Sequence, residues 1–315
     1  FTNKAAGEMK NRVAELVGTV AKSMWVSTFH SACVRILRQE AHRLGYTNNF
    51  TIYDSSDSQR LIALVAKDLN LDPKRYPPRQ FAATISNAKN ELLGPADYLN
   101  STNNQYEQIT ADVYTLYQKR LGQANAMDFD DLIMKSVEVI QRFPEVKARL
   151  RSRFRHILVD EYQDTNHAQY ILVKELVGND EEGLPAAELC VVGDADQSIY
   201  GFRGATIRNI LQFELDYLNA ESILLEQNYR STQNILSAAN AVIEQNQDRK
   251  AKNLWSESGP GTALVGYVAE SEHDEAEFIS GEIKKLANEG IDRKSTRLNS
   301  SHIPLSRMPS SAWKK

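Results

Sequence analysis

The stretch His156-Ile157-Leu158-Val159-Asp160-Glu161-Tyr162-Gln163-Asp164 decides the fold. Its first four residues predict a short apolar strand, and two adjacent carboxylates follow where that strand ends. Two more apolar runs also end in polar clusters: residues 189–192 before Gly193-Asp194, and residues 222–225 before Gln227-Asn228-Tyr229-Arg230. In open α/β sheets, ligands bind at the carboxyl ends of the strands. We therefore expect a parallel sheet with a functional edge.

Helical patterns surround these strands. Apolar residues at helical spacing predict helices over residues 4–17, 29–44, 132–143 and 232–244, and a short strand is expected over residues 24–28. Between residues 48 and 123 the pattern of predicted elements changes, because helical segments dominate there. They cover residues 58–69, 78–93 and 109–121, beside one strand over residues 50–53. The sequence thus predicts an α/β fold with a helical insertion.

The composition is that of an ordinary globular protein. The 315 residues carry a formal net charge of −4, and 42% are hydrophobic, so disorder is excluded as the main state. The length favours two or more domains, and no apolar run reaches the roughly 18 residues of a transmembrane helix. The mildly acidic net charge excludes a histone-like protein whose basic surface wraps nucleic acid, but it allows a local groove that binds nucleic acid. Cys33 and Cys190 lie in apolar runs without a CxxC neighbour, which predicts two buried free thiols in a reducing, cytoplasmic setting.

The Asp160-Glu161 pair suits nucleotide hydrolysis. Asp160 can hold Mg²⁺ directly or through water, because this ion requires hard oxygen ligands. Glu161 can orient and deprotonate an attacking water molecule. An exposed Asp-Glu turn is common, but the apolar strand before it and Gln163-Asp164 after it favour the functional interpretation.

A second cluster runs from Gly193 to Gly204. Gly193 permits a tight exit from the strand, and the amide of Gln197 can contact a terminal phosphate. Tyr200 and Phe202 alternate, so in an extended segment both rings point to one face, where bases can stack. Both rings could equally be core residues, and Arg203 beside them favours a nucleic-acid surface.

Other candidates lie at helix starts. Arg230 can reach a phosphate as an arginine finger, and Tyr229 can stack on a purine, although a plain surface arginine is the common alternative. The backbone N–H groups at helix N-termini bind phosphate, which draws attention to Asn3, Thr28 and His30. His30 fits a phosphate contact or a capping role better than a catalytic base. The acids of residues 127–132 open a helix, and the helix dipole explains them without a metal ion.

Taken in order, these segments resemble the UvrD/Rep/PcrA family of superfamily 1A DNA helicases. The matching motifs are FTNKAAGEM, STFH, MDFDDL, LVDEYQDTN, VVGDADQSIYGFRGA and LEQNYRST, and the resemblance covers about residues 1–292. The motif sequences most resemble those of the PcrA type. The resemblance implies an ATP-dependent 3′→5′ DNA helicase with ATP and Mg²⁺ as cofactors. Its implied partners are single-stranded DNA, junctions of single- and double-stranded DNA, and repair or replication proteins.

The resemblance also implies residue roles at the nucleotide. Asp160 holds Mg²⁺, and Glu161 is the catalytic base. Gln197 senses the γ-phosphate, Tyr229 packs near the adenine, and Arg230 is a finger from the second motor domain.

For DNA, the resemblance implies stacking residues, backbone contacts and one coupling residue. These are Phe1, Tyr200 and Phe202 for stacking, Asn3, Thr28 and His30 for the backbone, and Arg203 for coupling to the nucleotide site. Phe202 stands where close relatives often have tryptophan, so stacking is retained with less ring area.

The family pattern implies two RecA-like motor domains of the P-loop NTPase class, each with a mostly helical insertion. Residues 1–42 and 123–220 then form the first motor domain, residues 43–122 its helical insertion, and residues 221–292 the beginning of the second motor domain. Residues 293–315 resemble translated cloning sequence or a disordered tail. The chain has no G-x-x-x-x-G-K-[ST] phosphate loop, which we expect just before Phe1, so we expect the chain alone to be inactive as an ATPase.

Two alternatives stay open. One is the helicase subunit of a helicase–nuclease of the AddA or RecB type, which a downstream nuclease domain would reveal. The other is a non-catalytic fragment that binds single-stranded DNA, favoured if the phosphate loop was never encoded.

Overall fold

The computed structural model describes residues 2–179, 184–201, 205–206, 208–211, 213–246 and 252–291. The chain divides into two compact units, Phe1–Ala220 and Glu221–Lys315. Three predicted site residues, Phe1, Phe202 and Arg203, and the tail over residues 293–315 lie outside the described residues.

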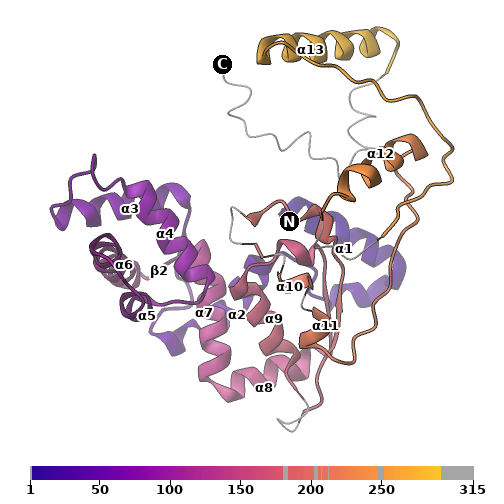
Figure 1. Cartoon of the computed structure of the whole chain (residues 1–315). Coiled ribbons are helices and arrows are strands. Elements are labelled where there is room, and N and C mark those ends of the chain that lie inside the picture. The colour runs from indigo at the N-terminus through magenta and orange to yellow at the C-terminus, as the bar shows by residue number, and fades with distance from the viewer. Residues whose placement is uncertain are drawn as a thin grey trace. The chain divides into compact units, whose positions relative to one another are not determined.

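The first unit is mostly helical (Figure 1). Its helices are α1 (Asn3–Val17), α2 (Phe29–Glu40), α3 (Ser55–Asp68), α4 (Pro78–Asn90), α5 (Pro95–Asn100), α6 (Gln105–Gln123), α7 (Phe129–Arg142), α8 (Pro144–Arg153), α9 (His167–Val177), α10 (Arg208–Leu211) and α11 (Phe213–Asp216). Its strands are β1 (Thr51–Tyr53), β2 (Ala126–Asp128), β3 (His156–Val159) and β4 (Glu188–Val191). The helices predicted from periodicity are present, with boundaries shifted by up to four residues.

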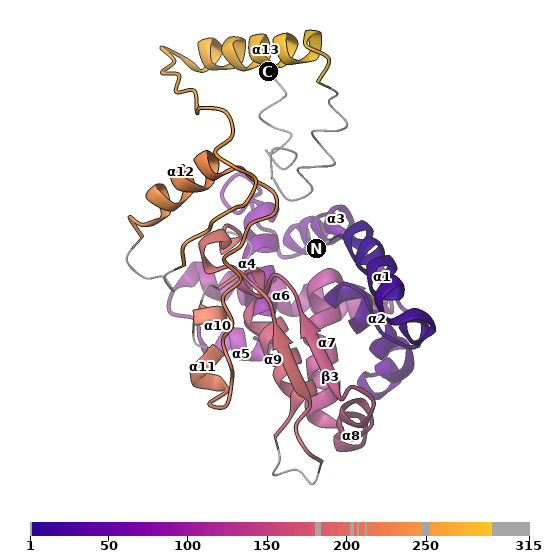
Figure 2. The same ribbon diagram turned by 90° about the vertical axis from the view of Figure 1, so that its right-hand side faces the viewer.

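Strands β3 and β4 pair in parallel, from His156 opposite Glu188 to Val159 opposite Val191. Figure 2 shows these strands with α7 and α9 beside them. One core gathers α2, α7 and α9, including Leu37, Leu132 and Ile140. The prediction that Asp160-Glu161 and Gly193-Asp194 leave the sheet at one edge is confirmed, because parallel strands end on the same side.

Two predicted strands are wrong. Residues 24–28 lie in a loop, where Trp25 packs edge-on against Phe154, and residues 222–225 form no strand. In the described residues the β3–β4 sheet has two strands, so residues 24–28 have no further strand of this sheet to supply their backbone hydrogen bonds.

The prediction for the cysteines is half right. Burial raises the pKa of the Cys33 thiol to about 12, whereas Cys190 is exposed. Cys190 lies on one face of the sheet with Leu158, which is 74% exposed. Side chains alternate between the two faces of a strand, so an apolar run alone does not show whether both faces are covered.

Helices α3, α4 and α6 enclose a second core, which includes Phe81, Tyr114 and Tyr117. The chain enters this helical insertion through β1 and leaves it through β2, and the two strands pair in parallel from Thr51–Ala126 to Tyr53–Asp128. The sequence predicted β1 but not β2, which is only three residues long and lies at the start of α7.

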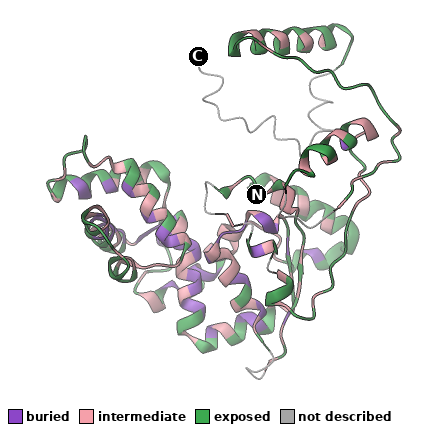
Figure 3. Cartoon of the chain, in the orientation of Figure 1, coloured by how far each residue is buried: buried purple, intermediate pink, exposed green. Residues whose placement is uncertain are grey.

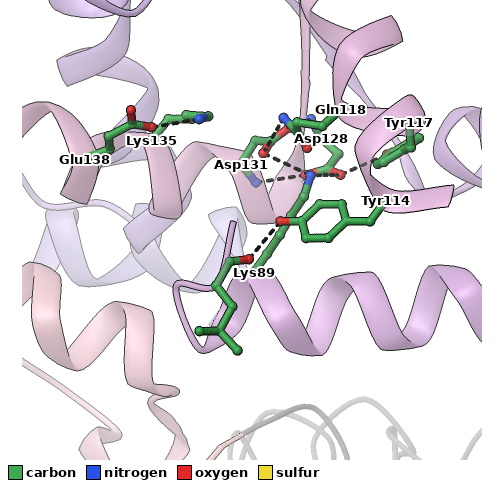
Figure 4. A network of polar contacts seen from close by, with 9 residues as sticks. Lys89, Tyr114, Tyr117, Gln118, Asp128, Asp131, Lys135 and Glu138 are labelled. Atoms are coloured by element: carbon green, nitrogen blue, oxygen red, sulfur yellow. Dashed lines mark hydrogen bonds and ion pairs between the residues drawn. The ribbon is translucent and has the colours of Figure 1, made fainter. Parts of the chain in front are cut away.

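A buried ion network fixes the insertion to α7 (Figure 4). The Nζ atom of Lys89, on α4, lies 2.6 Å from Asp128 Oδ2 and 2.9 Å from Asp131 Oδ1. Asp128 also caps α7, because its Oδ1 accepts a hydrogen bond from the backbone N–H of Asp131 at 2.8 Å. The prediction that these acids open a helix is therefore confirmed, and Lys89 is the partner that sequence reasoning missed. Tyr117 completes the network by donating its hydroxyl to Asp128 Oδ2 at 2.8 Å.

Burial and the neighbouring charges act in opposite directions on the pKa values of Lys89 and Asp128. Burial alone would lower the pKa of Lys89, but Asp128 and Asp131 outweigh it and hold that pKa well above its usual value. Burial would raise the pKa of Asp128, yet the Lys89 ammonium and the hydrogen bonds bring it below the usual value. Burial and then the charge of Asp128 raise the pKa of Asp130 to about 6.

The second unit has a sparse core. Its helices are α12 (Gln233–Ile243) and α13 (Glu272–Asn288), and among the described residues an isolated parallel bridge joins Gln227 to Trp255. Leu236 is buried on α12, whereas no residue of α13 is buried (Figure 3). None of the helices in the described part of the chain has the length and apolar character needed to span a membrane.

Replacing Lys89 by methionine should destabilise the first unit by about 3–5 kcal/mol, because two buried carboxylates lose their cation. The triple variant Lys89→Met/Asp128→Asn/Asp131→Asn should recover much of that loss, since it removes the stranded charges. Urea unfolding monitored by circular dichroism measures the free energy of unfolding of both variants. Lys119→Met, at an exposed position of α6, is the matched control. A loss below about 1 kcal/mol for Lys89→Met would show that the network is not a structural anchor.

The substitution Asp130→Asn should stabilise the chain at pH 7 by about 1–2 kcal/mol. The pKa of Asp130 is raised from 3.8 to about 6 in the folded state. Between these values the unfolded chain releases the proton while the folded chain keeps it, so stability falls as the pH rises through this window. The gain should therefore vanish at pH 3.5. Thermal unfolding across this range tests it, with the exposed Asp112→Asn as the control; equal gains at both pH values would contradict it.

Candidate functional site

Glu161 has a strained backbone at the end of β3. Its φ of +52° and ψ of +45° place a non-glycine residue in the left-handed region. The backbone N–H of Glu161 donates to Asp160 Oδ1 at 3.0 Å, and Asp164 N–H donates to the Glu161 carbonyl at 2.9 Å, so the turn is closed on both sides. Strain of this kind costs about 1–3 kcal/mol and gathers at functional sites.

Gln163 joins the two polar strand ends. Its side chain is buried, with Nε2 donating to Glu161 Oε2 at 2.8 Å and Oε1 accepting from the backbone N–H of Asp194 at 3.0 Å. The Glu161 carboxylate is therefore held on the side of the β4 exit. Sequence reasoning assigned no role to Gln163, and the available signal was an amide two residues after the carboxylate pair.

Gly193 is required by close packing. A Cβ atom there would lie 2.6 Å from Gln163 Oε1 and 2.8 Å from the Cδ1 atom of Ile210. The glycine therefore lets the β4 exit approach the Gln163 side chain. Gln197 lies on the same side, because its Nε2 donates to Asp194 Oδ2 at 2.6 Å. The predicted residues Glu161 and Gln197 are thus brought to one edge through Gln163 and Asp194.

The carboxylates suit an ion that keeps other ligands. Among the described residues, no group of three or more His, Cys, Asp or Glu side chains is arranged to hold a metal ion. Mg²⁺ commonly takes only one or two protein carboxylates and fills its shell with water and phosphate oxygens. Asp160, exposed at the end of β3, fits that mode.

Asn3 and Thr28 meet where α1 and α2 begin. The hydroxyl of Thr28 caps α2 by accepting from the Ser31 N–H at 3.3 Å. The hydroxyls of Ser31 and Thr28 donate to Asn3 Oδ1 at 3.3 and 3.4 Å. Two predicted residues from distant parts of the sequence therefore share one polar cluster beside two helix N-termini.

His30 packs edge-on against Phe129, with 5.6 Å between ring centroids. Burial lowers the pKa of His30, which favours the neutral imidazole. The Phe129 ring is 48% exposed beside it, at the start of α7. Sequence reasoning missed Phe129 because it lies between Asp128 and Asp130, in a stretch that was interpreted through its acidic residues.

Tyr200 is half-buried, and its carbonyl accepts from the Ala205 N–H at 3.4 Å. In the second unit, Tyr229 is 83% exposed and donates its hydroxyl to Gln227 Oε1 at 2.8 Å. The Asn228 side chain accepts from the N–H groups of Arg230 and Ser231 at 2.9 and 2.8 Å, which fixes the turn that presents Arg230. The first unit thus carries the predicted site residue Tyr200, and the second unit carries Tyr229 and Arg230.

Comparison with known proteins gives two matched domains. The family model for the UvrD/REP helicase N-terminal domain matches residues 1–218, and the model for the UvrD-like helicase C-terminal domain matches residues 223–301. The chain is 60% identical over 292 residues to the ATP-dependent DNA helicase UvrD1 of Mycobacterium tuberculosis (strain H37Rv), covering 91% of this chain and 38% of that protein. It is 50% identical over 290 residues to the ATP-dependent DNA helicase PcrA of Bacillus subtilis (strain 168), covering 92% of this chain and 38% of that protein.

The chain thus spans about 38% of the length of these relatives. The N-terminal-domain model alone covers more than half of the chain. The chain belongs to the UvrD/REP helicase family.

Proposed function

We propose that the chain is part of an ATP-dependent 3′→5′ DNA helicase that couples ATP hydrolysis to movement along single-stranded DNA and to duplex unwinding in repair or replication. The observation that carries this proposal is the Glu161 carboxylate, which follows β3 on a strained backbone and is held by Gln163 beside the β4 exit. The names of the relatives, ATP-dependent DNA helicases, support the same function.

The proposal extends to the domain plan. Residues 1–42 and 123–220 form a RecA-like motor domain, residues 43–122 its helical insertion, and residues 221–292 the beginning of a second motor domain. The parallel β3–β4 pair and the separate core of α3, α4 and α6 support the division of the first unit. The C-terminal family match, which begins at residue 223, supports the second boundary.

At the nucleotide, each residue has a separate task. Asp160 holds Mg²⁺, which supplies charge neutralisation on the phosphate oxygens. Glu161 orients the attacking water and accepts its proton at the carboxylate, while Gln197 contacts the terminal phosphate. Tyr229 packs against the adenine, and Arg230 places positive charge on the transferring group. The exposure of both Tyr229 and Arg230 leaves them available for this contact.

A second set of residues faces DNA. Asn3, Thr28 and His30 contact the phosphodiester backbone through hydrogen bonds, because the neutral imidazole still has an N–H donor. Phe129 and Tyr200 offer ring surface to the bases. Phe1, Phe202 and Arg203, outside the described residues, belong to the same proposed set by their motifs.

The Glu161→Gln variant should lose turnover while retaining nucleotide binding, since glutamine keeps the shape but accepts no proton. The test joins residues 1–292 to the segments of the M. tuberculosis relative that the match leaves uncovered, and measures DNA-stimulated ATPase and nucleotide affinity. Glu188→Gln, an exposed position on β4, is the matched control. Turnover of Glu161→Gln near that of the parent chimera would remove Glu161 from the mechanism.

The double variant Tyr200→Ala/Phe202→Ala should weaken binding of single-stranded DNA by about 1–3 kcal/mol for each lost stack. Fluorescence titration of the chain with a labelled oligothymidylate measures the affinity. Tyr267→Ala, a half-exposed aromatic position in the second unit, controls for a general loss of ring surface. Unchanged affinity in the double variant would assign the two rings to the core.

A further inference from the structure

Thr165 and Asn166 lie just beyond the turn that carries Glu161, and both are buried. The backbone N–H of Thr165 donates to the carbonyl of Tyr162 at 3.2 Å, and its hydroxyl donates to the same oxygen at 2.7 Å. Because Tyr162 directly follows Glu161, a displacement of Thr165 acts on the carboxylate turn through two hydrogen bonds.

The segment after Tyr200 reaches the same two residues. The Thr206 N–H donates to the Thr165 carbonyl at 3.1 Å. Asn209, at the start of α10 and 8% exposed, donates its amide Nδ2 to the Thr165 carbonyl at 3.1 Å and to the Thr165 hydroxyl oxygen at 3.0 Å. The same Nδ2 lies 3.5 Å from the Asn166 carbonyl.

The helical insertion provides the third connection. Asn166 donates its amide Nδ2 to Asn90 Oδ1 at 2.8 Å, while its own Oδ1 caps α9 by accepting from Gln169 N–H at 2.9 Å. Asn90 is the last residue of α4 and follows Lys89, which is held by the buried carboxylates of α7. The end of α4 is therefore fixed on one side to α7 and on the other to the start of α9.

We propose that Thr165 and Asn166 form a junction that couples two parts of the first unit to the Glu161 carboxylate. One part is the segment after Tyr200, which reaches the junction through Thr206 and Asn209, and the other is the helical insertion, which reaches it through Asn90. Asn209 and Asn90 are the positioning residues. The functional meaning of this coupling rests on the proposed helicase function. The physical reason is that the junction is buried, so a broken hydrogen bond is not replaced by one to water. A shift of α10 or α4 must therefore move Thr165 and Asn166 or break these bonds.

Two positions separate coupling from packing. Asn209→Asp keeps the side-chain shape but replaces the amide donor by a carboxylate that faces two oxygens of Thr165. Asn90→Ala removes the acceptor for Asn166, whereas Asn90→Asp retains an acceptor oxygen. Asn87→Ala, an exposed position one turn earlier on α4, is the matched control.

The first experiment measures amide hydrogen exchange of the whole chain without DNA. In peptides that cover Glu161–Gln169, exchange should be about fivefold faster in Asn209→Asp and Asn90→Ala, as the loss of one hydrogen bond implies. Asn90→Asp and Asn87→Ala should match the parent chain. Unchanged exchange in Asn209→Asp and Asn90→Ala overturns the proposal. If circular dichroism shows that Asn209→Asp does not fold, the variants Asn90→Ala, Asn90→Asp and Asn87→Ala decide alone. Normal exchange in Asn90→Asp together with fast exchange in Asn90→Ala then shows that position 90 must supply a hydrogen-bond acceptor.

The second experiment adds a saturating oligothymidylate, with affinity measured separately by fluorescence titration. Binding should change exchange over Glu161–Gln169 in the parent chain, and Asn209→Asp should abolish this response while its affinity stays within about twofold. A response that persists in Asn209→Asp overturns the coupling. If the parent chain does not bind the oligonucleotide, the proposed DNA surface fails, while the experiment without DNA still decides the junction.

Discussion

The parallel pairing of β3 with β4 is the constraint on which the candidate site depends. Four residue pairs keep Val159 opposite Val191, so Asp160-Glu161 and Gly193-Asp194 leave the sheet together. Parallel pairing requires a crossover, and α9 is part of it, since Val173 and Val177 of this helix share a core with Val159 of β3. Gln163 then needs only a short reach to bond both strand ends, and Gly193 leaves it the space.

The insertion depends on a different interaction. β1 and β2 contribute only three residue pairs, which is a small attachment for a helical subdomain with its own core. Lys89 adds a charged anchor that is fully removed from water, at the N-terminus of α7 where the carboxylates also cap the helix. A buried ion pair contributes little net stability but fixes one geometry, because every displaced position leaves a charge unpaired.

The sequence predicted the parts of the fold that depend on local pattern. β3 was placed without error, and the acids of residues 127–132 indicated the start of α7. Residues 24–28 and 222–225 have the same apolar character as β3, but a strand also needs a partner, which local pattern does not report. The site shows the same division, since Asp160 and Glu161 were found by their position after a strand. Phe129 and Lys89 act through contacts with residues far away in the sequence, so spacing alone could not identify them. Gln163 lies two residues after Glu161, but its link to Asp194 depends on the pairing of the two strands.

The left-handed backbone of Glu161 has a consequence for how this protein can be altered. Glycine adopts that conformation without the steric cost that a Cβ atom incurs, so replacing Glu161 by glycine relieves strain while it removes the carboxylate. The substitution also removes the acceptor for the buried Gln163 Nε2, so the relieved strain and the lost hydrogen bond act in opposite directions on stability. Selection of a random library for heat resistance alone therefore exerts little pressure to keep the proposed catalytic base, and any engineering programme must screen for turnover alongside thermal tolerance.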